Sequence, residues 1–266
     1  MDKALLPPME SAFTDAATSG VVEITVGQGD GCKTFRINKL YFQEKAPIFD
    51  RMFSANFKEG IIGSATLPED SCEAFAAFAK WLHSSKSKSS DKMLYPIFLY
   101  QTTSEIRWQM VETIVFADKY CLDRFSDAVM SWWIKYQAKV RLPLEELKKI
   151  TSYIIANCSN LCKSRDFFAH LWAIEMLQGP GKDHRQPSGD DLDAFVEDIN
   201  FSKKVFKKMS FLAFQKRDKW QPVCNYHRHS RFASCDDSGV ELYMFPFIQM
   251  NAETPAPKPK KKRRLI

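Results

Sequence analysis

Apolar and polar positions alternate at two places near the start of the chain. Residues 21–26 alternate in this way, and so do residues 34–37, which predicts two half-buried strands. The segment between them, Gly27-Gln-Gly-Asp-Gly31, is rich in glycine. Such a loop can cradle a phosphate where a strand leads into a helix. Here a strand follows a strand, so the pattern favours a hairpin turn.

Helical spacing replaces the alternation after residue 38. Asn38 is placed to cap a first short helix, because its side-chain oxygen can accept a backbone N–H. Pro47 suits the first position of a second helix, where its missing donor costs nothing. Ser64–Leu67 alternates again and predicts a third strand. The apolar positions of the two predicted helices are Leu40, Phe42, Ala46, Ile48, Phe49, Met52 and Phe53.

From residue 70 onward the apolar spacing is mostly helical. Asp70-Ser-Cys-Glu73 is typical of a capping box, and Thr102 with Glu105 forms a second cap signal. Gly179–Asp191 predicts a flexible break, followed by a short helix near Leu192–Ile199. The predicted helical stripes are Phe75, Phe78, Ala79 and Leu82; Ile106, Met110, Ile114, Ala117 and Cys121; Phe125, Val129, Trp132 and Tyr136; Leu144, Leu147, Ile150 and Ile154; and Phe167, Phe168, Leu171, Trp172 and Leu177.

Three of these stretches resemble the BTB/POZ domain. The first is Phe35-Arg-Ile-Asn-Lys39 followed by Pro47-Ile-Phe-Asp-Arg-Met-Phe53. The second is Leu67-Pro-Glu-Asp70 with Trp81-Leu-His83, and the third is Phe116-Ala-Asp-Lys-Tyr-Cys-Leu122. The chain departs from the family pattern where Asn38 replaces His, Ala46 replaces Ser and His83 replaces Tyr. The resemblance implies an α/β (α+β) fold with a small sheet and helical hairpins.

The remaining helices resemble the C-terminal extension of the long BTB proteins of fungi. With that resemblance, the chain is predicted to contain a mobile leader (1–18), a BTB/POZ domain (19–139), an all-α helical extension (140–217), a Cys/His-containing segment (218–250) and a disordered basic tail (251–266).

Composition and charge narrow the functional classes. The 266 residues contain no apolar run long enough to span a membrane and no secretory signal. Seven cysteines without paired spacing predict reduced thiols in cytosol or nucleus. The net charge of +6 equals the charge of six tail residues, so the rest of the chain is neutral and no specific nucleic-acid binding is predicted.

The basic tail resembles a nuclear import signal read by an import receptor. Proline keeps such a segment extended, so its cations can reach several acidic pockets. The alternative is a solvated tail that touches nucleic acid weakly through counterion release. The first interpretation predicts a nuclear protein, or one shared between nucleus and cytoplasm. Its residues are Lys258, Lys260, Lys261, Lys262, Arg263 and Arg264.

One Cys/His constellation has the residue types of a structural zinc site. Cys224, His227, His229 and Cys235 supply a Cys₂His₂ set, although their spacing differs from that of a zinc finger. The same segment matches a Cys-x-Tyr-His-x-His sequence of the long fungal BTB proteins. The alternative is an exposed Cys/His-rich loop without metal, and no other cofactor is predicted.

Two further pairs are interpreted as core. Cys158 and Cys162, four residues apart, are expected to share a helix face as buried apolar side chains. Trp132 and Trp133 could form a stacking platform for bases, but adjacent aromatic residues on an amphipathic helix favour packing.

The chain shows no pairing of a nucleophile with a base, so no enzyme activity is predicted. The resemblance implies a non-catalytic protein–protein interaction module, a scaffold or adaptor that forms homodimers. Phe57 and Glu59 match the hydrophobic-x-Glu motif by which some BTB domains bind a cullin, which makes a substrate adaptor of a cullin-based ubiquitin ligase the alternative. The motif has a second interpretation, a loop that closes the preceding helix.

Overall fold

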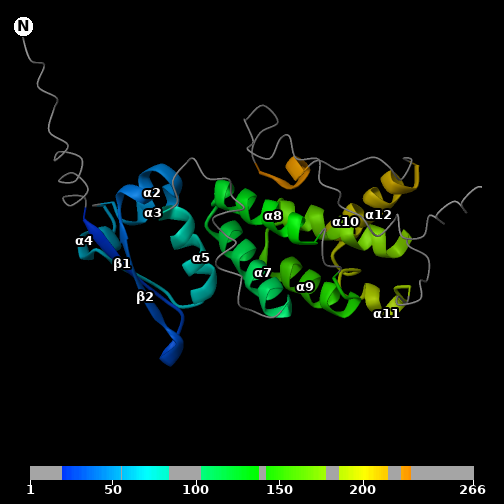
Figure 1. Cartoon of the computed structure of the whole chain (residues 1–266), viewed down its shortest axis with the longest axis horizontal. Helices are drawn as coiled ribbons and strands as arrows, with labels where there is room; N and C mark the ends of the chain where they lie inside the picture. The colour runs from blue at the N-terminus through cyan, green and yellow to red at the C-terminus, as the bar shows by residue number, and fades with distance from the viewer. Residues whose placement is uncertain are drawn as a thin grey trace, which may run out of the picture.

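The computed structural model describes residues 20–54, 56–83, 103–137, 142–177, 186–214 and 223–228. A small three-stranded mixed sheet near the N-terminus is followed by a mostly helical region. The molecule is elongated, with the sheet at one end and the helices extending away from it (Figure 1). This arrangement confirms the predicted mixed α/β class.

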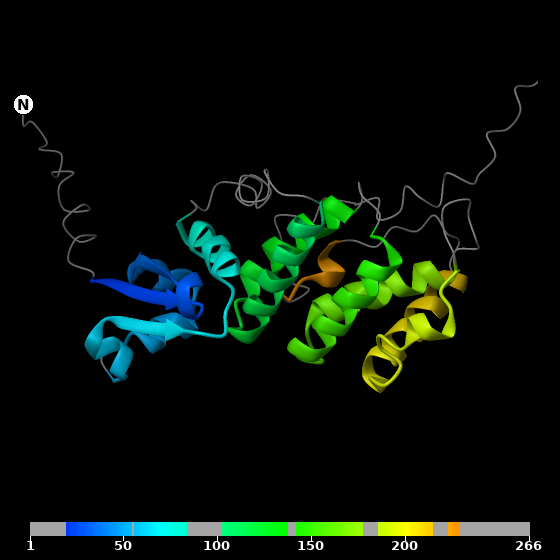
Figure 2. The ribbon, with the colours of Figure 1, turned by 90° about the horizontal axis from the view of Figure 1, so that it is seen from below.

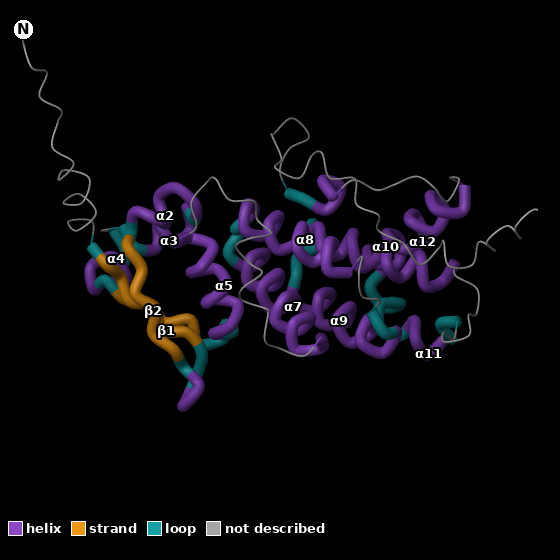
Figure 3. The backbone as a smooth tube through the Cα atoms, viewed as in Figure 1, coloured by secondary structure: helices purple, strands orange, loops and turns teal. Residues whose placement is uncertain are grey.

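The sheet has the order β2-β1-β3. Strands β1 (Val21–Val26) and β2 (Lys33–Asn38) are antiparallel, and β3 (Ser64–Leu67) runs parallel to β1. The glycine-rich segment forms the hairpin turn with a single 3₁₀ turn, η1 (Gly29–Gly31), as the strand-to-strand pattern predicted. Alternate β1 residues are fully buried, so one face of the sheet packs on the core. Figure 3 shows helices covering that face.

Three short helices connect β2 to β3: α2 (Leu40–Lys45), α3 (Pro47–Met52) and α4 (Lys58–Ile62). The Leu40 N–H donates to Asn38 Oδ1 at 3.0 Å, so the Asn38 side chain bonds the first turn of α2, although the N-cap position is occupied by Lys39. Pro47 occupies the first turn of α3, as predicted. A Cβ atom on Gly60 would collide with the backbone of Ser54. The glycine therefore lets α4 pack closely on the turn that follows α3.

Helix α5 (Cys72–His83) has its cap one residue after the predicted position, at Ser71 instead of Asp70. Ser71 Oγ accepts the Ala74 N–H at 3.3 Å, while Glu73 pairs with Lys33 at 2.9 Å. The predicted capping box starting at Asp70 is wrong, because that carboxylate forms a tertiary contact with the end of helix α7 (Thr103–Lys119). The residue that caps α5 is Ser71. Glu73, the expected second member of the capping box, forms an ion pair with Lys33 of β2 instead.

Phe49 lies at the centre of an aromatic core between the sheet and the helices. It is fully buried, and its ring lies 5.3 Å from that of Phe78, 5.4 Å from that of Phe42 and 5.1 Å from that of Tyr120. Burying rings of this size supplies much of the free energy that holds α2, α3, α5 and α7 together. The aromatic positions that the sequence marked as core thus meet in one cluster.

The helical region consists of α7 (Thr103–Lys119), α8 (Asp123–Gln137), α9 (Leu144–Asn157), α10 (Lys163–Leu177), α11 (Gly189–Leu192) and α12 (Ile199–Phe214), with the 3₁₀ turn η3 (Val223–Tyr226). Figure 2 shows these helices in succession away from the sheet, with η3 lying beside α8 and α10. Helix α7 contacts α5 on one side and α9 on the other, so it joins the two parts of the molecule.

Two boundaries differ from the prediction in this region. Part of the predicted break is helical, because Ser188 and Asp191 form a capping box for α11. The short helix predicted near Leu192–Ile199 is wrong: a turn occupies residues 193–197, and the long helix α12 begins at Ile199. Trp133 is fully buried against Phe168, which confirms its predicted core role, whereas Trp132 is half-buried.

Among the helices in the described part of the chain, none has both the length and the apolar character needed to cross a bilayer.

Candidate functional site

Exposed apolar side chains gather at the end of the sheet where β1 begins. The Lys39 N–H donates to the Gly20 carbonyl at 3.3 Å, and the Glu23 N–H donates to the Gly63 carbonyl at 3.0 Å. These bonds bring the start of α2 and the end of α4 to the same end of β1. The side chains there are 42–77% exposed. We call this surface the α4 face; it consists of Val21, Leu40, Phe57, Ile61 and Ile62.

The two residues of the predicted cullin motif lie on or next to this face. Phe57 precedes the first residue of α4 with its ring 52% exposed, and Glu59 lies in the first turn of the helix. The Phe57 N–H donates to the Ser54 carbonyl at 3.2 Å, which holds the motif against the end of α3. A hollow of about 260 Å³ lies between α2 and α3 beside this turn. The structure thus presents both side chains at the surface.

The end of α7 forms a junction between the sheet and the helical region. Lys119 Nζ lies 3.0 Å from Asp70 Oδ1, and the Tyr120 hydroxyl donates to Asp70 Oδ2 at 2.7 Å. Burial, followed by the nearby Asp70 carboxylate, raises the pKa of Tyr120, so the phenol remains a hydrogen-bond donor. These contacts tie the start of α5 to the end of α7.

Asp118, the residue before Lys119, contacts the helical region and not the start of α5. Its carboxylate accepts the Ser159 N–H at 2.8 Å, which fixes the turn between α9 and α10. It also forms an ion pair with the guanidinium of Arg228. The Asp118 side chain is only 6% exposed, so these partners compensate a buried charge.

Residues 223–228 dock on α8 and α10 through polar contacts. The Arg228 N–H donates to Asp127 Oδ1 at 2.6 Å, and its guanidinium also lies 3.2 Å from Asp123 Oδ1. Tyr226 is fully buried, and its hydroxyl lies 2.8 Å from His170 Nδ1. A segment more than 40 residues beyond α10 is therefore part of the core.

His227, one of the predicted metal ligands, is buried in the same contact. Its Nε2 lies 2.9 Å from Ser131 Oγ, and the Ser131 hydroxyl is 2.9 Å from the Asp127 carbonyl. If that hydroxyl donates to the carbonyl, Nε2 carries a proton and donates to Ser131, a role that a metal ligand atom cannot play. Cys224 is half-buried in η3, while His229 and Cys235 lie outside the described residues. The predicted Cys₂His₂ set stays a prediction.

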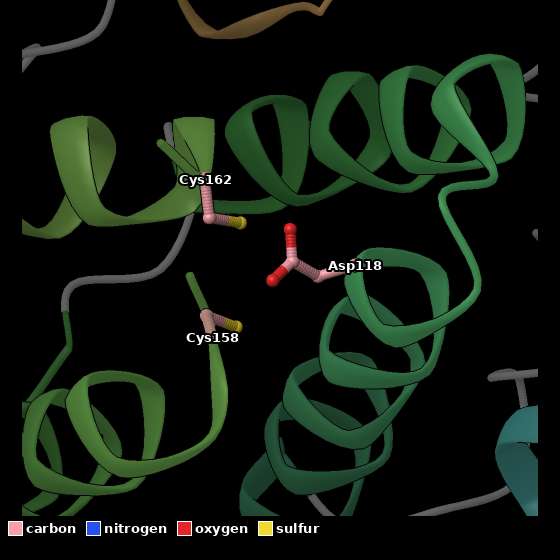
Figure 4. A group of neighbouring side chains, drawn as sticks. All are labelled: Asp118, Cys158 and Cys162. Atoms are coloured by element: carbon pink, nitrogen blue, oxygen red, sulfur yellow. The ribbon is translucent and has the colours of Figure 1, made fainter. Parts of the chain in front are cut away.

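Asp118 also lies close to two cysteines, Cys158 and Cys162, and the three residues are of types that bind metal ions. The sulfurs of Cys158 and Cys162 and a carboxylate oxygen of Asp118 all lie within 4.8 Å of one another. Figure 4 shows both sulfurs directed toward the carboxylate. We call this group the thiol cluster: Asp118, Cys158 and Cys162.

The two cysteines are buried as predicted, but they do not share a helix face. Cys158 immediately follows the last residue of α9, and Cys162 immediately precedes α10, so the pair brackets the turn between the helices. A hydrogen bond from Cys158 and others from Ser164 lower the pKa of Cys162, whereas donation to Cys162 and burial raise that of Cys158.

The sequence contained only part of the signal for this cluster. Cys-x-x-x-Cys falls within the ligand spacing known from zinc sites. The third member lies 40 residues earlier on another helix, so only the packing of α7 against the turn between α9 and α10 brings it close. The residues of the basic tail, Lys258–Arg264, lie outside the described residues.

No family model matches this chain, and no curated protein matches it.

The buried His170 predicts a pH dependence of stability. Burial, with a smaller effect of the Lys208 charge, lowers the pKa of His170 to about 3. In the unfolded chain His170 has an ordinary histidine pKa of about 6.5. Below that pH the unfolded chain therefore binds a proton at His170 that the folded protein does not bind. The contribution of neutral His170 to the free energy of unfolding is complete above about pH 6.5, and it is lost progressively as the pH falls toward 3. Between about pH 7 and 5, we expect the unfolding free energy to fall by up to about 2 kcal/mol.

Urea unfolding of the full chain at both pH values measures this loss. His170→Gln, which keeps an acceptor for the Tyr226 hydroxyl, should show a smaller pH dependence than the wild type. The exposed His83→Gln should behave like the wild type. An equal pH dependence in the His170→Gln protein would contradict the prediction.

Proposed function

We propose that this protein is a non-catalytic protein–protein interaction module of the BTB/POZ type, acting as a scaffold or adaptor. Support comes from where the motifs of the resemblance fall. Phe35–Lys39 forms the C-terminal part of β2 and the residue after it, Pro47–Phe53 forms α3 and its C-cap, and Phe116–Leu122 forms the last turn of α7 and the three residues that follow it. Each motif has a structural role in joining the sheet to the helices.

The observation that carries the proposal is the α4 face. Five apolar side chains stay exposed on or next to β1, α2 and α4, and these elements lie in the part of the molecule that contains the sheet (Figure 1). Contiguous exposed apolar surface on a folded protein is typical of a site where another protein binds. Polar residues near it, such as Glu59 and Lys39, would form the rim of such an interface.

Two partners fit this surface. One is a second copy of the chain, because an apolar face at the end of a sheet can pair with itself about a two-fold axis. The other is a recruited protein. The exposed Phe57, with Glu59 two residues on, favours a cullin as that protein, which gives the alternative function of a cullin ubiquitin ligase adaptor.

Sedimentation of the full chain tests the proposal. At about 50 μM, well above a micromolar dissociation constant, we expect the mass of a dimer. Ile61→Glu with Ile62→Glu should shift the protein to the monomer, because two desolvated carboxylates would oppose each other across the interface. The control is Phe206→Glu, which places the same change on an exposed apolar position of α12 and should leave the dimer intact.

A purified cullin N-terminal region is added in a second series. A shift in sedimentation that Glu59→Lys removes, while the dimer persists, would favour the adaptor function. A monomer that also fails to bind the cullin would contradict the assignment of the α4 face to protein binding.

We further propose that the module acts in the nucleus, with import through Lys258–Arg264. The support is that these residues hold the whole net charge of an otherwise neutral chain. Fusing residues 252–266 to a cargo too large to diffuse through nuclear pores should move the cargo into the nucleus, and Lys260→Ala with Lys261→Ala should abolish the movement. A fusion that stays cytoplasmic would contradict import by this tail.

A further inference from the structure

The thiol cluster has the donor set and the compactness of a metal site. Two sulfurs and one carboxylate oxygen lie within 4.8 Å of one another. In a tetrahedral zinc site the donor atoms are about 3.6–3.8 Å apart, as bond lengths of about 2.1–2.3 Å require. Bringing the three donors to that spacing needs movements of about 1 Å at most, which side-chain rotation can supply. We propose that Asp118, Cys158 and Cys162 bind a zinc ion.

The choice of metal follows from the ligands. Thiolates select zinc and other soft or borderline ions over magnesium and calcium, which prefer oxygen ligands. The Cys-x-x-x-Cys spacing is within the range by which zinc sites take two ligands from one turn. Ser164 Oγ lies 2.9 Å from the Cys162 sulfur and 4.0 Å from that of Cys158. It is close enough to both sulfurs to supply, directly or through a water molecule, the fourth ligand.

The surroundings hold each ligand in place. Arg165 donates to the carbonyl of Cys158 at 3.0 Å and pairs with Asp198 at 2.8 Å, which fixes the end of α9. The Ser159 N–H and the Arg228 guanidinium orient the Asp118 carboxylate. Hydrogen bonds of this kind to ligating groups are typical of metal sites, where they set ligand orientation.

The charges also balance. One carboxylate and two thiolates carry three negative charges, so a bound Zn²⁺ leaves one negative charge in a buried place. The guanidinium of Arg228, paired with Asp118 and 15% exposed, offsets that charge. Binding replaces any proton held by Cys158 or Cys162 with a sulfur–zinc bond, and that proton is released to the solvent.

A zinc ion at this position would join three helices. Asp118 belongs to α7, Cys158 immediately follows α9 and Cys162 immediately precedes α10. Both sulfurs and the carboxylate are largely buried, so the site is closed in the manner of a structural rather than a catalytic zinc site. The inference concerns the helical region and does not depend on the proposed function of the α4 face.

Cobalt provides the direct test. The full chain is stripped of metal with a chelator under reducing conditions and titrated with Co²⁺ alone. We expect one equivalent to bind, with a thiolate-to-cobalt charge-transfer band in the near ultraviolet and the intense visible bands of tetrahedral cobalt. Zinc added afterwards should displace the cobalt and remove the bands. Element analysis of protein purified without chelator should show one zinc per chain.

Variants assign the site. Cys162→Ser and Cys158→Ser should each remove the charge-transfer band or weaken cobalt binding at least tenfold, and Asp118→Asn should weaken it. The matched control is Cys121→Ser, an exposed thiol near the same helix end, which should bind cobalt like the wild type. Cys224→Ser should also leave the band unchanged. Circular dichroism confirms that each variant is folded.

Alkylation of the wild-type chain gives a readout without any variant. Zinc should protect Cys158 and Cys162 from iodoacetamide, as mapped by mass spectrometry of the peptides, while Cys121 stays reactive. The proposal is overturned if no cobalt band forms, if the band and the affinity survive unchanged in both Cys158→Ser and Cys162→Ser, or if zinc leaves the alkylation of Cys158 and Cys162 unchanged. A Cys158–Cys162 disulfide in protein isolated without oxidant would also overturn it.

Discussion

The described structure depends on a buried carboxylate at the end of α7. A charge with only 6% of its side chain exposed is tolerated only if other groups compensate it. Asp118 meets this requirement with the Ser159 N–H from the turn between α9 and α10 and with the guanidinium of Arg228 from the docked segment. Removing either partner would leave a charge that cannot reach water. The need to compensate this one group thus places three distant parts of the chain together.

Lys119 and Tyr120, which follow Asp118, connect the end of α7 to the other side of the molecule. Lys119 and Tyr120 both bind Asp70, at the start of α5 on the side of the sheet. The chain can turn so sharply here because Cys121 adopts a left-handed conformation, with φ of 50°, and the Leu122 N–H returns to the Ala117 carbonyl at 2.9 Å. Residues 117–122 therefore face the sheet with one set of side chains and the helical region with another. The Ala-Asp-Lys-Tyr sequence of this helix end thus contributes contacts to both parts of the molecule.

Local patterns predicted most of the elements. The alternation in β1 and the apolar spacing of α5 and α9 required one face to be buried, and in the structure it is. Helix α10 differs, because residues 167–174 are buried around its whole circumference. The errors came where a residue had two possible partners. Asp70 has the side chain of a helix cap, but it binds Lys119 and Tyr120, which lie about 50 residues away. Ser188 and Asp191 resemble loop residues, yet Asp191 also binds Lys148 of α9, which anchors α11.

Local sequence patterns predicted less about the candidate sites than about the helices and strands. Phe57 is exposed and Glu59 is half-buried beside it. That these two side chains lie close together was predictable, because they are two residues apart in the sequence. The thiol cluster was not, because Asp118 is separated by 40 residues from Cys158, and no local spacing records that distance. His227 was predicted as a metal ligand from its neighbours in sequence. Its partner, Ser131, lies 96 residues away, and the docking of residues 223–228 brings the two side chains together.

A double-mutant cycle on Asp118 and Arg228 tests most directly whether this carboxylate holds the helical region together. Asp118→Asn, Arg228→Met and the double variant are unfolded with urea in the presence of a chelator, so that no metal contributes. Each single change should cost about 2–4 kcal/mol, because it leaves a buried group without its partner. The double variant should cost less than the sum, by a coupling free energy of about 1–3 kcal/mol. Costs that add to within about 0.5 kcal/mol would show that the two side chains act independently and would contradict the account.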